Sequence, residues 1–260
     1  MTTASRIDPG STLGVLVAER PARSELFERL GLDYCCGGQQ TLGEACSSRG
    51  LDLASVRDAL AALDAEDMLS ASPESADWRE APIAELCAHI VTVHHHGLRE
   101  AFPRLQRLFA TVVGAHADSE PRLGDAHHLF SEIRTELEPH LASEEAELFP
   151  ACIACVQNGT HVDPGMLEEH EHEHEAVGGA LAALRRLCQD FDRATALCHT
   201  HRALLDALEA FERDLHRHVH EENNILFTRI REAQAKSPAA RDEDDRRLCE
   251  TWARALRRSG

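Results

Sequence analysis

The sequence predicts an all-α protein, and three observations support this prediction. The 260-residue chain is rich in Ala, Leu, Glu and Arg, which favour helices. Aromatic residues make up only 4% of the chain, and strand-like runs of Val, Ile, Thr and Tyr are absent. From Pro82 to Glu232, apolar residues recur at helical spacing over long segments. A chain of this length can form one large domain or two small ones.

Residues 10–65 are expected to form a small helical region. A first helical stretch contains Leu13, Leu16 and Leu26, is interrupted by Pro21 and ends at Gly31. The turn Asp33-Tyr-Cys-Cys-Gly-Gly38 follows it. A second helix is expected to begin at Thr41 or Leu42 and to continue through Leu63. Residues 64–79 are acidic and contain Ser and Pro, which indicates a linker.

Four long helices are expected after the linker, near 82–113, 122–157, 164–190 and 197–233. They are separated by short breaks that contain glycine, asparagine or aspartate. Long helices with short connections are typical of an up-down-up-down four-helix bundle. We therefore divide the chain into an N-terminal helical domain at 8–66, a linker at 67–80, a bundle at 81–233 and a C-terminal helical extension at 234–260.

The charge balance argues against a nucleic-acid-binding protein. The 27 basic and 45 acidic side chains give a net charge of −18, and no basic stripe is available to neutralise phosphates. We also expect no membrane association, because the longest nearly apolar run, 148–156, is far shorter than the ~20 residues of a membrane span. No secretory signal precedes residue 10, and nine cysteines lack a disulfide spacing. A cytoplasmic location is therefore expected.

The 17 histidines are confined to the segment from His89 to His220. Five of them have a glutamate four residues later, which places both side chains on one helix face. The five pairs are His96/Glu100, His116/Glu120, His128/Glu132, His140/Glu144 and His218/Glu222. Because chance alone produces some such pairs, the neighbouring residues must decide which of them point into the bundle.

Only two of the five pairs share a face with a clear apolar stripe. His140 lies on the face of Phe130 and Leu137, and His218 lies on the face of Phe211 and Leu215. His96 and His128 share faces with polar residues, and His116 is expected in a loop. The same criterion selects His95 and His174 as the inward histidines of the other two helices. Each helix therefore directs one histidine toward the core.

A buried carboxylate is costly unless it is paired or bound to a metal ion. Imidazole and carboxylate ligands suit iron, zinc or manganese. Six ligands exceed the four of a single structural zinc site, so two metal ions bridged by the glutamates are expected. The set is His95, His140, Glu144, His174, His218 and Glu222.

The acidic tract 168–175 leaves the histidine of the third helix open. His170 and His174 share one face, whereas His172 points about 200° away from His174. Gly178, four residues after His174, offers space beside a metal site and favours His174 as the ligand. The remainder of the tract is interpreted as a solvated charged face, with loose surface metal binding as the alternative.

The cysteines fall into two groups. Cys35 and Cys36 stand in a glycine-containing turn ahead of a helix, where thiols can have a lowered pKa and react as thiolates. A disulfide between adjacent cysteines would be strained. We expect this pair to handle nitric oxide, exchange electrons, or bind iron or a client transiently, with two plain turn residues as the alternative. Cys152 and Cys155 lack a second pair for a zinc site and are expected to pack in a helix.

These motifs together resemble the repair of iron centres family of di-iron proteins. The matching segments are the turn 33–38, Pro82 to His95, His140-Leu-Ala-Ser-Glu144 with the following Leu148-Phe149-Pro150, Glu173 to Gly178, and His218 to Phe227. The resemblance covers about 10–230. It implies a hemerythrin-like bundle that holds two iron ions, bridged by an oxo group and by Glu144 and Glu222. The chain departs from the family at Thr228, where proline is usual.

The resemblance also implies a function. The family is implicated in repairing iron–sulfur clusters damaged by nitric oxide or peroxide, by donation of iron to the damaged proteins as clients. Its members are cytoplasmic and often dimeric, so a homodimer is one expected state. Glu136 and Glu173 resemble acidic residues beside the family's iron site, in contact with the ligands or along an iron exit route.

Three functions remain in competition. The chain is an iron donor for cluster repair, a nitric-oxide-reducing enzyme, or a carrier or sensor of oxygen or nitric oxide. The cysteine domain argues against a simple carrier, which would need only the bundle.

Overall fold

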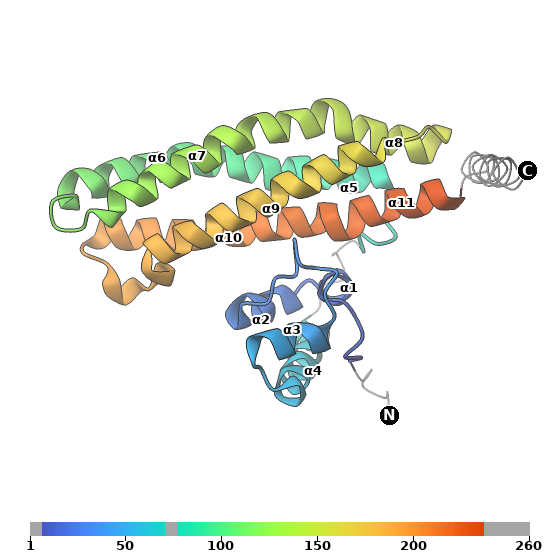
Figure 1. Cartoon of the computed structure of the whole chain (residues 1–260), viewed down its shortest axis with the longest axis horizontal. Coiled ribbons are helices and arrows are strands. Elements are labelled where there is room, and N and C mark those ends of the chain that lie inside the picture. The colour runs from blue at the N-terminus through green and yellow to red at the C-terminus, as the bar shows by residue number, and fades with distance from the viewer. Residues whose placement is uncertain (1–6, 71–76, 237–260) are drawn as a thin grey trace, which may run out of the picture.

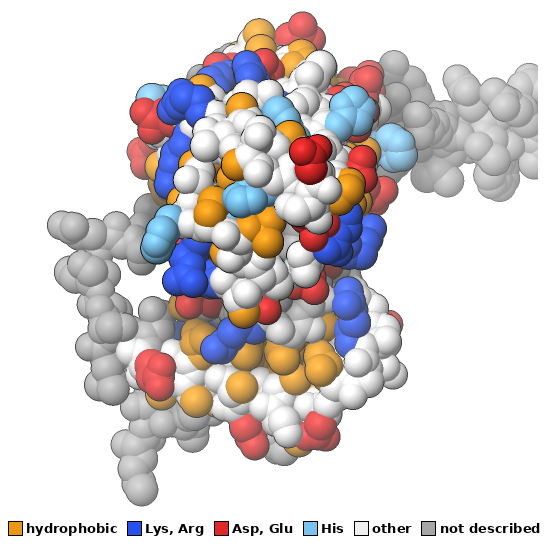
Figure 2. Space-filling view, turned by 90° about the vertical axis from the view of Figure 1, so that its left-hand side faces the viewer, with side chains coloured by type: hydrophobic (Ala, Val, Ile, Leu, Met, Phe, Trp, Pro, Cys, Tyr) orange, Lys and Arg blue, Asp and Glu red, His pale blue; other side chains and the backbone are white. Residues whose placement is uncertain are grey.

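A computed structural model describes residues 7–70 and 77–236, and in these ranges the chain is all-α, as predicted. Four long rods of helix form a bundle, and a smaller helical domain packs against its side (Figure 1). Viewed from one end of the bundle, basic and acidic side chains are interspersed over its surface (Figure 2). Within the described ranges, no helix combines the length and apolar character needed to cross a membrane. Most of the predicted C-terminal extension, 237–260, lies outside the described residues.

The N-terminal domain contains α1 (Leu13–Glu19), α2 (Arg23–Leu30), α3 (Leu42–Arg49) and α4 (Leu53–Ser70). The prediction of one helix from residue 42 through Leu63 is wrong. Gly50 adopts a left-handed conformation with φ of 65°, and its N–H caps the end of α3, so α4 starts afresh. Thr41 fixes the other end of α3 through a capping box with Glu44. Helix α4 continues to Ser70 and so includes 67–70 of the segment expected as linker.

The bundle is built from four rods. The first comprises α5 (Ile83–His89), η1 (Ile90–His95) and α6 (His96–His116). The second comprises α7 (Arg122–Ser143), η2 (Glu144–Leu148) and α8 (Phe149–Asn158). The third is α9 (Pro164–Leu187), followed by the short turns η3 (Gln189–Phe191) and η4 (Arg193–Thr195). The fourth comprises α10 (His199–His220), η5 (Glu221–Leu226) and α11 (Phe227–Lys236). His116, expected in a loop, ends α6.

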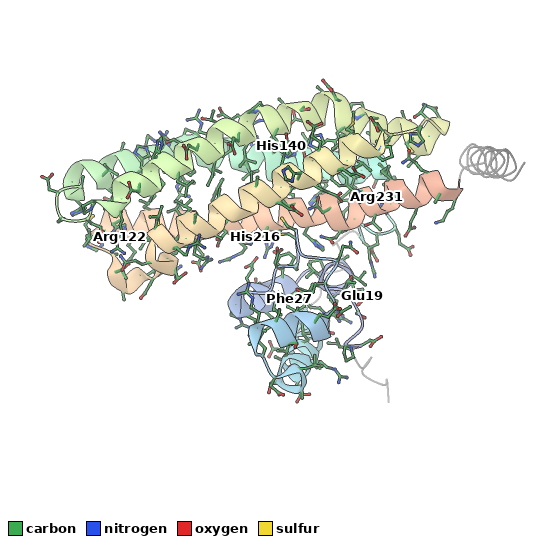
Figure 3. The ribbon with its side chains drawn as sticks, viewed as in Figure 1. Glu19, Phe27, Arg122, His140, His216 and Arg231 are labelled. Atoms are coloured by element: carbon green, nitrogen blue, oxygen red, sulfur yellow. The ribbon has the colours of Figure 1, made fainter. Side chains whose placement is uncertain are left out.

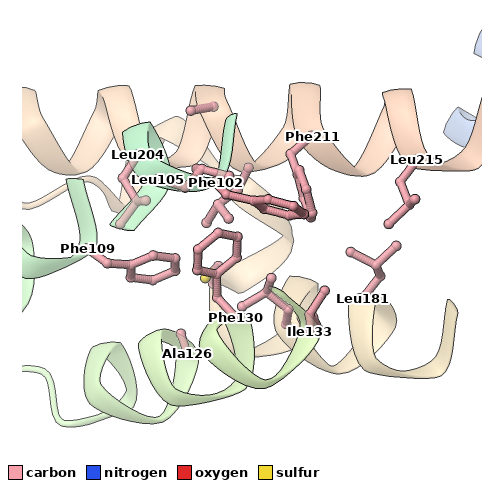
Figure 4. Packing of buried hydrophobic residues seen from close by; sticks show 14 of the residues in the cluster. Phe102, Leu105, Phe109, Ala126, Phe130, Ile133, Leu181, Leu204, Phe211 and Leu215 are labelled. Atoms are coloured by element: carbon pink, nitrogen blue, oxygen red, sulfur yellow. The ribbon is translucent and has the colours of Figure 1, made fainter. Parts of the chain in front are cut away.

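The apolar core of the bundle is divided into two clusters. The larger one contains Phe102, Phe109, Phe130 and Phe211, whose rings contact one another (Figure 4). The second cluster lies toward α5, α8 and α11 and includes Leu86, Leu148 and Phe227. On each rod the predicted metal ligands lie, in sequence, where one cluster gives way to the other, although Leu141 and Val219 of the larger cluster follow His140 and His218. Packing of both clusters therefore fixes the height at which these ligands meet.

One asparagine of the bundle connects it to the N-terminal domain. Asn224 Nδ2 donates hydrogen bonds to the carbonyl oxygens of Tyr34 and Cys35, at 3.2 and 2.9 Å. Its amide fits only because residues 14 and 38 are glycines: a Cβ atom at Gly14 or Gly38 would lie about 2.3 or 2.2 Å from Asn224 Oδ1. These two glycines also pair with each other, Gly14 N–H donating to the Gly38 carbonyl at 2.8 Å. The cysteine turn is thereby held against η5.

We expect Gly38→Ala to destabilise the protein by about 1–3 kcal/mol, because the new methyl group displaces the Asn224 amide and leaves buried carbonyls unpaired. Urea unfolding of the two proteins measures the difference. Gly114→Ala in α6 is the matched control, since nothing lies within 4 Å of its Cβ position. The control should retain or slightly raise stability. Equal stability of Gly38→Ala and the wild type would show that the Asn224 contact contributes little.

Candidate metal centre

The four rods bring together all six residues that the sequence analysis selected. His95 comes from η1, His140 from α7, Glu144 from η2, His174 from α9, His218 from α10 and Glu222 from η5. All are buried, and both glutamates are 0% exposed. Figure 3 marks the level of this cluster in the bundle by the label of His140. The cluster lies well inside the bundle.

Three of the rods contain a π-helical turn at the site, which the sequence analysis did not predict. The N–H groups of His96, Phe149 and Phe227 donate to carbonyls five residues earlier, of Val91, Glu144 and Glu222. In the remaining rod, the third, helix α9 is a regular α-helix from Pro164 to Leu187. A π turn widens the helix and inserts an extra residue, and such turns are frequent at functional sites. At this site the π turns direct consecutive residues of one rod toward the same part of the bundle interior.

The six residues form two groups that share both glutamates. In the first group, His95 Nε2 and His218 Nε2 lie 3.2 Å apart. In the second, His140 Nε2 and His174 Nε2 lie 3.1 Å apart. Each group, completed by Glu144 and Glu222, has its ligand atoms within 4.8 Å of one another. A first-row metal ion about 2.1 Å from each ligand atom separates neighbouring ligand atoms by about 3.0–3.4 Å. The observed spacing suits one ion per group.

Each glutamate directs one oxygen to each group. Glu144 Oε2 lies 3.4 Å from His95 Nε2, whereas its Oε1 lies 3.0 Å from His140 Nε2. Glu222 Oε1 lies 3.0 Å from His218 Nε2, whereas its Oε2 lies 3.2 Å from His174 Nε2. This is the arrangement that two bridging carboxylates require.

The surroundings of the four buried carboxylate oxygens also fit a metal centre. None of the four oxygens of Glu144 and Glu222 has a hydrogen-bond partner, although imidazole nitrogens lie as close as 3.0 Å. The nitrogen and oxygen atoms are thus close but not aligned as donor and acceptor, as expected of atoms that face a common ion. Without metal, burial alone would raise the pKa of Glu222, but His218, His174 and His95 hold this pKa well below its ordinary value. The carboxylates are therefore ionised and ready to bind cations.

Three further side chains orient the histidine rings. His95 Nδ1 lies 2.8 Å from Glu145 Oε1, His140 Nδ1 lies 2.6 Å from Glu173 Oε2, and His174 Nδ1 lies 2.9 Å from Asn223 Oδ1. A partner of this kind fixes the tautomer, so that Nε2 is left free for a metal ion. Of these three, the sequence pattern pointed to Glu173 but not to Glu145 or Asn223. Each directly follows one of the two buried glutamates, Glu144 or Glu222. In an α-helix this position would lie on a face that points away from the core.

Within the acidic tract, the three histidines have different surroundings. His174 Nε2 lies 3.2 Å from Glu222 and 3.6 Å from Glu144. The closest carboxylate oxygen of Glu144 is 3.8 Å from His170 Nδ1, and His172 is exposed. His174 thus lies nearest to both carboxylates. Gly178 faces the cysteine turn: its Cβ position lies 3.5 Å from Cys36 Sγ, and no side-chain atom of the six residues lies within 4 Å of it.

The pairs judged to be outward-facing are exposed. The side chains of His96 and Glu100 are 69% and 72% exposed, and those of His128 and Glu132 are 78% and 56% exposed. His140 and Glu144, with the same spacing, are 6% and 0% exposed. The apolar neighbours of a pair, not the spacing, distinguish the buried sites.

A hollow of about 680 Å³ leads from the surface to His140. Its lining includes His170 and Glu173 and further acidic groups, among them Glu136, Glu147 and Glu169. Glu136 is exposed on α7, so it lines this hollow but lies outside the inner cluster. An acidic passage of this kind favours the movement of cations.

The cysteine turn lies beside α9. Cys36 Sγ lies 3.5 Å from the carbonyl oxygen of His174, and the Sγ atoms of Cys35 and Cys36 are 3.9 Å apart and unbonded. The expected lowering of the thiol pKa is wrong for Cys35. Its hydrogen bond with Cys36, burial and the nearby Asp33 carboxylate raise the pKa of Cys35 well above the ordinary value. A small hollow beside both thiols is also lined by Asn223, the partner of His174.

Cys152 and Cys155 are buried among the apolar residues of the second cluster. Burial raises the pKa of Cys152. Both therefore pack in the core, as predicted.

Two known family models match the chain, one over its N-terminal helical domain and the other over its bundle. Residues 9–64 match the model of a domain of unknown function (DUF542). Residues 87–230, more than half of the chain, match the hemerythrin HHE cation binding domain.

Curated relatives match across both regions. The iron–sulfur cluster repair protein YtfE of Edwardsiella ictaluri (strain 93-146) is 37% identical over 219 residues, which cover 84% of this chain and 95% of that protein. The protein of the same name from Musicola paradisiaca (strain Ech703) is 34% identical over 224 residues, covering 86% and 97%. That of Yersinia pseudotuberculosis serotype O:1b (strain IP 31758) is 36% identical over 221 residues, covering 84% and 95%. The chain therefore belongs to the family of iron–sulfur cluster repair proteins with a hemerythrin-type cation-binding domain.

Proposed function

We propose that this protein repairs damaged iron–sulfur clusters by donating iron from a dinuclear centre in its bundle. The observation that carries the proposal is the pair of fully buried glutamates, each with one oxygen toward each pair of histidines. In this assignment His95 and His218 would hold one iron ion and His140 and His174 the other, while Glu144 and Glu222 would each supply one oxygen to both ions. An oxo group between the ions would complete the proposed centre. The relatives named as iron–sulfur cluster repair proteins support this assignment.

The surroundings of the centre support release of iron as cargo. The hollow that reaches His140 is lined by carboxylates, which lower the energy of a cation along the path. Glu173, which orients His140, stands in the wall of the same hollow and is half exposed. Movement of Glu173 would free His140 and, at the same time, open the hollow toward the surface. Glu136 lies farther along the route. We propose the cytoplasm as the location, where the eight described cysteines remain free thiols.

A second function is supported by the number of ligands. Each group supplies two nitrogen and two oxygen ligand atoms, which leaves positions for a small ligand on an octahedral ion. Bound iron would supply a site for nitric oxide or oxygen there. Catalytic turnover of nitric oxide with an added reductant would favour this enzyme function, whereas stoichiometric transfer of iron to an apo-cluster protein favours repair by donation.

Metal analysis of purified protein tests the ligand assignment. We expect two iron ions per chain, and we expect His140→Ala and His218→Ala to lose most of this iron together with the near-ultraviolet absorption of an oxo bridge. Buried ligands cannot be replaced by water without loss of affinity. His128→Ala is the matched control, because it removes the histidine of an exposed His-x3-Glu pair. One zinc ion, or equal iron in all four proteins, would contradict the assignment.

The cysteine turn is tested separately from the metal centre. We expect Cys35→Ala/Cys36→Ala to retain its iron but to lose transfer of iron to an apo-cluster protein, because the thiols contact α9 without belonging to the ligand set. The measured quantity is the rate at which the client regains its cluster absorption. Cys46→Ala, which removes a buried thiol of the same domain, is the control. Full transfer by the double variant would show that the pair serves only as a turn.

A further inference from the structure

A second cluster of metal-ligating side chains lies next to the dinuclear centre and shares no residue with it. His89 ends α5, His94 belongs to η1, and Glu221 begins η5. One ligand atom of each lies within 4.8 Å of the others. Glu221 Oε2 is 3.4 Å from His89 Nε2 and 3.5 Å from His94 Nε2. Ligands about 2.0–2.1 Å from a tetrahedral ion are separated by about 3.3–3.4 Å, so these spacings suit one shared ion.

Two of the three atoms that face one another in this cluster, His94 Nε2 and Glu221 Oε2, have no hydrogen-bond partner. His94 is buried, its side chain being 5% exposed, and its Nε2 makes no hydrogen bond. Glu221 Oε2 is likewise buried without a hydrogen bond. Unpaired buried nitrogen and oxygen atoms cost free energy, and this cost is removed when both bind the same cation. The cluster therefore shows the same feature that marks Glu144 and Glu222 in the dinuclear centre.

The surrounding residues orient this cluster as they would a metal site. His94 Nδ1 lies 2.8 Å from Asp214 Oδ1, so an Nδ1–H group donated to Asp214 leaves Nε2 free as a ligand. The ring of His94 also stacks on that of His218, with centroids 5.8 Å apart. The ring of His89 packs on Trp78, at a centroid distance of 4.3 Å. Both imidazoles are thus held by neighbours outside the cluster.

The π turn explains why the two histidines converge. They are five residues apart, and in an α-helix this spacing would leave their side chains about 140° apart around the axis. The π-helical η1 closes a turn with five-residue hydrogen bonds, which brings residues at this separation to one face. A site of this kind therefore cannot be recognised in the sequence from α-helical periodicity.

We propose that His89, His94 and Glu221 form a third metal site, which binds one divalent transition-metal ion such as Zn²⁺ or Fe²⁺. Two imidazoles and one carboxylate are a ligand set that suits these ions and leaves a fourth position for water. His89 and Glu221 are 24% and 14% exposed, so an ion can reach the site from the surface. The site lies beside the His95–His218 group, whereas the acidic hollow reaches the His140–His174 group.

Titration of the metal-free full-length protein with Co²⁺ tests the proposal. We expect three equivalents to bind to the wild type and two to Glu221→Gln and to His89→Ala, counted by metal analysis after removal of free ion. The loss should be accompanied by loss of the visible absorption of one Co²⁺ ion. Asp214→Ala should keep the site but weaken it about 10–100-fold, because it frees the His94 ring.

His96→Ala and Glu100→Gln are the matched controls. Their side chains also stand 3.4 Å apart, but both are exposed, so each variant should bind three equivalents. Circular dichroism of the metal-free variants identifies any that fail to fold. The same titration in a His140→Ala/His174→Ala background separates the third site from the dinuclear centre, because His89→Ala should still remove one equivalent there. Equal stoichiometry in the wild type, Glu221→Gln and His89→Ala would overturn the proposal.

Discussion

The burial of two ionised carboxylates is the constraint on which the rest of this structure depends. Glu144 and Glu222 are fully buried in a bundle whose core is otherwise apolar, where an uncompensated charge is costly. Four histidines from four rods surround them and hold the carboxylates in the ionised form. Apolar clusters on both sides of the centre keep the rods at fixed heights. The same arrangement that makes the carboxylates tolerable in the core also makes them suitable bridging ligands.

The π turns are the local means by which this arrangement is achieved. In a regular α-helix, the residue after a ligand points away from the centre. The π turns at η1, η2 and η5 instead let the residue after a buried glutamate face the centre as well. Glu145 therefore orients His95, and Asn223 orients His174. The rod without a π turn, α9, supplies His174 and Glu173 at the ordinary helical register. The two kinds of rod together surround the centre with ligands and with the partners of those ligands.

Two adjacent asparagines connect the proposed metal centre to the small domain. Asn223 contacts His174, and Asn224 holds the backbone of Tyr34 and Cys35. His220, on the same rod, is uncharged at neutral pH, because burial lowers its pKa to about 4. Its ring packs on the ring of Tyr34. The cysteine turn therefore rests on the segment that carries Glu222. Hydrogen bonds from η5 thus reach both the cysteine turn and the ring of His174.

The sequence by itself determined the helical fold, the inward histidines of three rods and the two buried glutamates, because apolar periodicity over several turns marks the core face of a helix. On the third rod it favoured His174 but left His170 open, since both share one face. It did not determine the break at Gly50 or the end of α4, which depend on single capping contacts. Only the tertiary structure decided which carboxylate oxygen faces which histidine pair. It alone revealed Glu145, Asn223 and the convergence of His89 with His94, and it reversed the expected pKa of Cys35. The physical reason is that π turns shift the register of a rod, while distances and burial between rods depend on packing that no single helix encodes.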